Sequence, residues 1–171
     1  LDDYNTAQTP NTSDKIGRYA FGEQAEVVLW NLLQLANAFY PICKRPEQLE
    51  ASLSYFRELY EQKHHSMMNQ KLGLTQSDAD FIDSTKKLLV YYKLDYTIFF
   101  RGLSDIESNS VFSDFDGLIS KASYTAEDSE LDMEEAKTWF NNYLELIIAS
   151  PVASRKTMMT EVNPNFILRN H

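Results

Sequence analysis

The chain has 171 residues and a formal net charge of −9, a length that suits one domain with a buried core. The acidic balance argues against a nucleic-acid-binding surface, which carries clustered Lys and Arg, and it disfavours binding to anionic membranes. The single Cys43 excludes an intrachain disulfide, and no apolar run approaches the ~20 residues that cross a bilayer. We therefore expect neither nucleic acid nor a membrane among the partners.

The first 21 residues are polar and rich in Asn, Thr, Ser and Asp. This composition favours turns capped by side chains over a helix or a strand, so we expect a surface loop that needs a partner to order it. Its candidates for a binding role are Asn11, Ser13, Asp14, Arg18 and Tyr19. A buried structural ion pair would explain this charged group about as well as a binding role does.

Apolar residues after residue 22 recur every three or four positions, the spacing of amphipathic helices. The first predicted helix runs from about residue 23 to 40, carries Trp30, and is expected to bury its apolar face. Further helices are predicted at about 46–72, 78–92, 96–103, 112–119, 133–149 and 151–161, with a loop at 120–131 and a last helix starting at Asn163-Pro164. No β-hairpin signal is present. The fold class is all-α, with roughly six or seven packed helices preceded by a polar loop.

Several polar residues are placed where helices should begin or end. Ser77, with Asp80 three residues later, is predicted to cap the third helix, and Asp95 the fourth. Gly73 is predicted to end the second helix. Arg101 lies in the short aromatic fourth helix, where it could pair with a carboxylate through two hydrogen bonds.

The residues alone indicate no active site. Glu61-x-x-His64 matches half of a di-iron carboxylate motif, but the second half is absent from the sequence. The sequence has no nucleophile elbow and no glycine-rich phosphate loop. We therefore assign no catalytic, cofactor-binding or metal-ligating residue to the chain, and a metal-dependent helical bundle stays a minor alternative.

Short motifs nevertheless follow one another in a characteristic order. They are Asn11-Thr-Ser-Asp14, Gly17-Arg-Tyr-Ala-Phe21, Leu29-Trp-Asn-Leu32, Lys71-Leu-Gly73, Asp95-Tyr-Thr97, Phe100-Arg101, Leu103-Ser104, Trp139-Phe140, Asn163-Pro-Asn165 and Leu168-Arg-Asn170. Together they resemble the selenoprotein O family of kinase-like protein adenylyltransferases. The resemblance spans nearly the whole chain. It departs at Thr9-Pro10, where many members have a cysteine, which puts thiol regulation in doubt.

The resemblance implies a fragment of an enzyme. Family members bind ATP with Mg²⁺ or Mn²⁺ and transfer AMP to hydroxyl side chains of proteins, and their catalytic and nucleotide-binding residues precede the stretch seen here. Residues 1–21 would be an activation-segment-like loop and residues 22–171 the helical C-lobe segment. The absence of an initial Met also leads us to expect a piece of a longer protein.

The predicted function is thus that of a structural, non-catalytic segment of a protein adenylyltransferase. Its expected partners are the N-terminal kinase-like lobe of the same protein and, for the full-length enzyme, protein substrates. ATP and metal are expected in the full-length protein and not in this segment alone. The location would be cytoplasmic in a bacterium, with mitochondria possible in a eukaryote. The alternative is a non-catalytic helical module that docks a partner through an apolar face.

Overall fold

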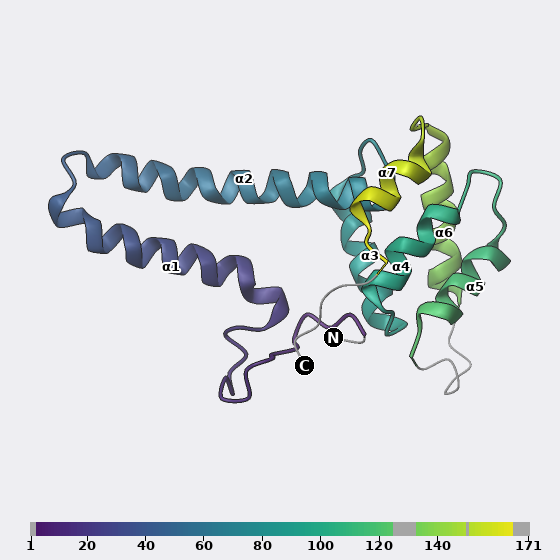
Figure 1. Ribbon diagram of the computed structural model, residues 1–171, viewed down its shortest axis with the longest axis horizontal. Helices are drawn as coiled ribbons and strands as arrows, with labels where there is room; N and C mark the ends of the chain where they lie inside the picture. The colour runs from purple at the N-terminus through teal and green to yellow at the C-terminus, as the bar shows by residue number, and fades with distance from the viewer. Residues whose placement is uncertain (1–2, 125–132, 150, 166–171) are drawn as a thin grey trace. The chain divides into compact units, whose positions relative to one another are not determined.

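The computed structural model describes residues 3–124, 133–149 and 151–165, and these residues form seven α-helices and no strand (Figure 1). The all-α prediction is therefore confirmed. The helices are α1 (Gln24–Phe39), α2 (Pro46–Leu72), α3 (Ala79–Tyr91), α4 (Tyr96–Gly102), α5 (Phe112–Ala122), α6 (Glu134–Ala149) and α7 (Arg155–Val162). Single 3-10 turns occur at Phe21–Glu23, Tyr40–Ile42 and Leu103–Asp105.

The chain divides into two compact units, and each is described here by itself. One unit comprises residues 5–64, and the other comprises residues 1–4 with 65–171. The boundary falls inside α2, whereas the sequence-based division at residue 21 followed the change from polar to amphipathic composition. The polar loop and α1 thus belong to the same compact unit.

An aromatic cluster fills the core of the unit that contains α3 to α7. The ring of Phe115 stacks on the rings of Trp139 and Phe140, each with centroids 5.2 Å apart. Trp139 also stacks on Tyr143 at 4.9 Å, and its indole N–H donates to the Thr85 hydroxyl at 3.1 Å. Trp139 and Phe140 are both almost completely buried and belong to this core.

Arg155, the first residue of α7, binds main-chain carbonyls from separate parts of this unit. Its guanidinium donates to the carbonyl oxygens of Ile106 at 2.7 Å and Gly73 at 3.2 Å, and it also contacts the Tyr143 hydroxyl. The Tyr143 hydroxyl donates to Leu72 O at 2.7 Å. Burial raises the pKa of Tyr143 to about 12, although the neighbouring Arg155 acts in the opposite direction. One cation thereby holds together the main chain at the end of α2 and the main chain that follows α4.

Arg101 uses its guanidinium in a similar way, and the expected carboxylate partner is not found among the described residues. Its Nη1 donates to the carbonyl oxygens of Thr160 at 2.7 Å and Asn163 at 2.8 Å, at the end of α7. A cation is favourable at this end of a helix, where carbonyl oxygens lack intrahelical partners. Arg101 therefore stabilises the end of α7, and the prediction of a paired carboxylate is corrected.

Helix ends agree with the sequence in most places. α2 begins at Pro46, and Gly73 follows its last residue with a φ of +69°, as predicted for a C-terminal cap. Asp95 caps α4 by accepting from Ile98 N at 2.8 Å, and it also accepts from the Tyr124 hydroxyl. Both predictions are confirmed.

Four predicted boundaries need correction or fall outside the described residues. Asp78 caps α3, accepting from Phe81 N at 2.7 Å, because the Ser77 hydroxyl instead donates to the buried Asn69 side chain. α5 extends to Ala122, and α7 begins at Arg155 rather than at residue 151, after Ser154 with a φ of +57°. The helix predicted from Asn163 would lie mainly on residues 166–171, which the structure does not describe.

Candidate functional site in the N-terminal loop

Residues 5–23 form the loop that carries five of the six candidate residues. The side-chain oxygen of Asn11 accepts from the backbone N–H of Ser13 at 3.1 Å and from its hydroxyl at 2.7 Å. The backbone N–H of Asp14 donates to Asn11 O at 3.1 Å. This is the turn that asparagine stabilises through its own side chain. Asn11 and Ser13 therefore shape the loop.

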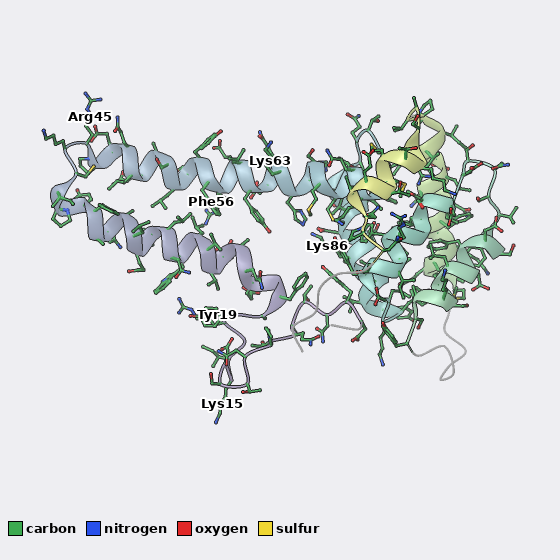
Figure 2. The ribbon with its side chains drawn as sticks, viewed as in Figure 1. Lys15, Tyr19, Arg45, Phe56, Lys63 and Lys86 are labelled. Atoms are coloured by element: carbon green, nitrogen blue, oxygen red, sulfur yellow. The ribbon has the colours of Figure 1, made fainter. Side chains whose placement is uncertain are left out.

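Asp14 closes the second turn of the loop with both carboxylate oxygens. Oδ1 accepts from Arg18 N at 3.1 Å, and Oδ2 accepts from Tyr19 N at 2.7 Å. Gly17 between them has a φ of +72°, a conformation that other residues adopt with strain. The carboxylate thus fixes the backbone from which the Arg18 and Tyr19 side chains project; Figure 2 shows Tyr19 and Lys15 on this loop.

Arg18 lies against α1. Its guanidinium carbon is 4.1 Å from the centre of the Trp30 ring and 5.8 Å from that of Tyr19. The ring face attracts the cation and holds the guanidinium plane, while its N–H groups can still bind an acceptor. Among the described residues no carboxylate lies within ion-pair distance of Arg18. Trp30 is 46% exposed rather than buried in a core, which corrects the prediction for this ring.

The beginning and end of the loop run beside each other. Gly22 N donates to Thr6 O at 2.8 Å and Phe21 N to Gln8 O at 2.9 Å, and a Cβ on Gly22 would lie 3.0 Å from the Thr6 Cβ. A hollow of about 420 Å³ opens here, and Arg18 is one of its lining residues. Its other lining residues include Thr6, Ala7, Ile16, Gly17 and Glu23. Arg18 and Glu23 bring opposite charges to this lining, so the hollow by itself favours no anion, and Arg18 is the one basic group among its described lining residues.

Lys71, near the end of α2, is a perturbed group that the sequence marks only as part of the Lys71-Leu-Gly73 motif and not as a candidate site residue. Burial lowers its pKa. The ammonium donates to the Asn163 side-chain oxygen at 3.3 Å and lies 5.4 Å from the Tyr96 ring centre. A lysine of lowered pKa can mark a functional site, but these partners are structural ones. No local sequence pattern could have found it, because Asn163 is distant in the chain.

No group of three or more His, Cys, Asp or Glu side chains is arranged to hold a metal ion in residues 3–124, 133–149 and 151–165. His64 of the half di-iron motif stacks on Tyr60 at 5.9 Å. A shallow groove of about 380 Å³ between α3 and α6 has Lys87 beside Glu134 and Glu135, a mixture of charges without a single sign. None of the described helices is both long and apolar enough to cross a membrane.

Comparison with known proteins decides the family. A sequence model described as "Protein adenylyltransferase SelO" matches residues 1–171. The chain belongs to this family. The resemblance inferred from the ordered motifs is therefore confirmed.

Curated members of the family extend well beyond this chain. The chain is 35% identical to a protein named "Protein nucleotidyltransferase YdiU" from Aromatoleum aromaticum, 36% identical to one of that name from Flavobacterium johnsoniae, and 33% identical to one from Rhodopirellula baltica. Each match covers the whole chain but only 33%, 34% and 35% of the respective relative. The chain thus spans about a third of the length of these SelO-family nucleotidyltransferases.

Proposed function

We propose that this chain is part of a SelO-family enzyme that transfers AMP from ATP to hydroxyl side chains of proteins, on a kinase-like fold and with Mg²⁺ or Mn²⁺. The match of the family model to residues 1–171 carries this proposal. The curated relatives, named as protein nucleotidyltransferases, support it. Residues outside this chain would bind ATP and the metal, since the resemblance implies that the family's catalytic motifs precede it.

Within that enzyme, we infer that the chain is a structural, non-catalytic segment. Three of its charged side chains bind its own main chain. Asp14 accepts from two backbone amides, and Arg101 and Arg155 donate to backbone carbonyls. Groups engaged in this way fix the positions of loops and helix ends. They are not available as bases or nucleophiles without loss of those hydrogen bonds.

Residues 5–23 would border the active site as an activation-segment-like loop. Arg18 supports this role, because its side chain is oriented by Trp30 and its N–H groups point to no carboxylate of the described residues. In the complete enzyme Arg18 and Asp14 would fix this loop beside the catalytic part. Arg18 would then be a positioning residue.

The test compares the product of the complete gene with the 171-residue chain. Full-length protein incubated with isotopically labelled ATP, Mg²⁺ or Mn²⁺ and a mixture of acceptor proteins should label a protein with AMP, as seen by mass spectrometry of modified peptides. Absence of label with either metal, from protein that is folded and binds ATP, would overturn the transferase proposal. Calorimetry should detect no ATP binding to the 171-residue chain; micromolar binding would overturn its non-catalytic role.

A further inference from the structure

Helix α1 has the composition of a buried helix, yet it buries no residue. Its sixteen residues contain one charged side chain, Glu26. Helices of this composition are normally covered by protein on a wide face. In the unit of residues 5–64, however, Ala20 is the only buried residue. Within the unit of residues 5–64, α1 therefore does not bury the apolar face that the sequence led us to expect it to bury.

Most apolar residues of α1 form a broad stripe with a partly covered centre, whereas Val27, on the opposite side, is also half-buried. Positions 25, 29, 32 and 36 lie one above another at helical spacing and are half-buried. A row of exposed side chains flanks this centre on one side: Val28, Leu35 and Phe39, the last two 53% and 49% exposed. Leu33 is exposed on the other side. The apolar surface is thus open along both edges of the helix.

The stripe faces away from the loop contact on the same helix. With 100° between successive residues, Trp30 lies about 140° around the helix from the centre of the stripe. Its ring is the one that holds Arg18. α1 therefore has two distinct sides, one that contacts Arg18 of the loop and one that presents apolar side chains.

The lengths of the relatives indicate what covers the stripe. The chain spans only about a third of each curated relative, so about two thirds of such a polypeptide is not represented here. A domain-sized portion of the same polypeptide is large enough to cover a surface that is open along both edges of the helix. Packing within one chain also brings the surface and its partner together at high effective concentration.

We propose that the apolar stripe of α1 is the docking surface for the part of the same polypeptide that this chain does not span. This inference rests on the proposed function, since it takes the missing part to be the catalytic portion. Docking of the stripe would fix α1, and α1 would carry Arg18 and the loop with it. The loop would thereby be positioned against the catalytic portion.

The test is hydrogen–deuterium exchange of residues 24–39 in the full-length protein and in the 171-residue chain. We expect exchange in the full-length protein to be slower by roughly a hundredfold, because amides of docked helices exchange only through larger opening reactions. A paired substitution adds a second measurement. Leu35→Asp should lower the thermal midpoint of the full-length protein and leave the helix content of the 171-residue chain unchanged. Asn31→Asp, an exposed position about 100° around α1 from Trp30 and outside the stripe, is the matched control.

Two other outcomes would identify a different occupant of the stripe, and two would separate the docking surface from the proposed function. Equal protection in both proteins would overturn the inference in favour of cover from residues 65–171. Protection of the 171-residue chain that rises with its concentration would indicate a second copy. Fast exchange of residues 24–39 in a full-length protein that transfers AMP would overturn the docking surface and leave the proposed function intact. Slow exchange of residues 24–39 in a full-length protein that transfers no AMP would support the docking surface and overturn the proposed function.

Discussion

The guanidinium of Arg18 lies 4.1 Å from the centre of the Trp30 ring, and this contact joins the polar loop to α1. Stacking of an arginine on an exposed indole contributes about 0.5–1 kcal/mol, too little to hold a fold together. It is enough to select one orientation of the guanidinium. The pair therefore serves orientation more than stability.

Arg18→Ala in the full-length protein should reduce AMP transfer by at least about tenfold, since the loop loses its oriented cation, while the thermal midpoint changes little. Trp30→Leu should reproduce part of the loss by freeing the guanidinium. The measurements are initial rates of labelling and thermal unfolding of the same preparations. Proportionate losses of activity and stability would make Arg18 a structural residue.

Asp14→Ala should loosen the loop, because two backbone amides lose their acceptor. Loss of one charge-assisted hydrogen bond near the surface is worth about 1 kcal/mol, so the amides of Arg18 and Tyr19 should exchange roughly fivefold to tenfold faster. Exchange in α6 should be unaffected and serves as an internal control. Unchanged exchange at both amides would show that the turn does not depend on the carboxylate.

Arg155→Met should destabilise the unit of residues 65–171 by about 3 kcal/mol, because several carbonyl oxygens lose a charged donor. Urea unfolding followed by circular dichroism measures the change. The neighbouring Lys156→Met is the control: its ion pair with Asp105 is exposed, and its loss should have little effect. Similar effects of the two substitutions would contradict the role given to Arg155.

Gly73→Ala should destabilise the same unit by about 1–2 kcal/mol or more. The φ of +69° disfavours a side chain, and the added Cβ would lie 2.6 Å from Arg155 Nε and also collide with Met159. Gly117→Ala is the matched control. That position lies inside α5 with nothing within 4 Å of the added Cβ, so alanine should stabilise the helix by about 0.5–1 kcal/mol. A shift in the same direction for both variants would refute the distinction.

The unit that comprises residues 1–4 and 65–171 should lose stability at alkaline pH. The pKa of Tyr143 is raised to about 12 by burial, whereas the unfolded phenol titrates near 10. Below pH 10 both states keep the proton; as the pH rises from about 10 to 12, the unfolded state loses it first and is favoured. Tyr96, with a pKa also raised to about 12, adds to the effect. Thermal midpoints between about pH 9 and 11 should fall, and Tyr143→Phe should flatten that dependence.

Local signals in the sequence predicted the helices well, because proline, glycine and capping residues act on their own neighbourhood. Pro46, Gly73 and Asp95 are examples. The cap of α3 was misassigned because Ser77 has a stronger partner in Asn69, which no local rule includes.

Contacts over long sequence separation were beyond such reasoning. The sequence marks Arg101 as a candidate, but its partners are the carbonyls of Thr160 and Asn163, about sixty residues away. The roles of Asn11, Ser13, Asp14, Arg18 and Tyr19 beside an active site stay predictions. The exposure of α1 was missed because periodicity reports that a face is apolar and not which part of a polypeptide covers it.

The carbonyl contacts of Arg155 bear on how this family can diverge. The guanidinium recognises main-chain oxygen, which every residue type supplies, at Leu103 and Ile106 among other positions. Apolar substitutions at those positions should preserve the contacts, whereas no other side chain offers the same fan of five donors. Substitutions should therefore be tolerated at Leu103 and Ile106 far more readily than at Arg155, because these carbonyl contacts depend on the arginine side chain alone.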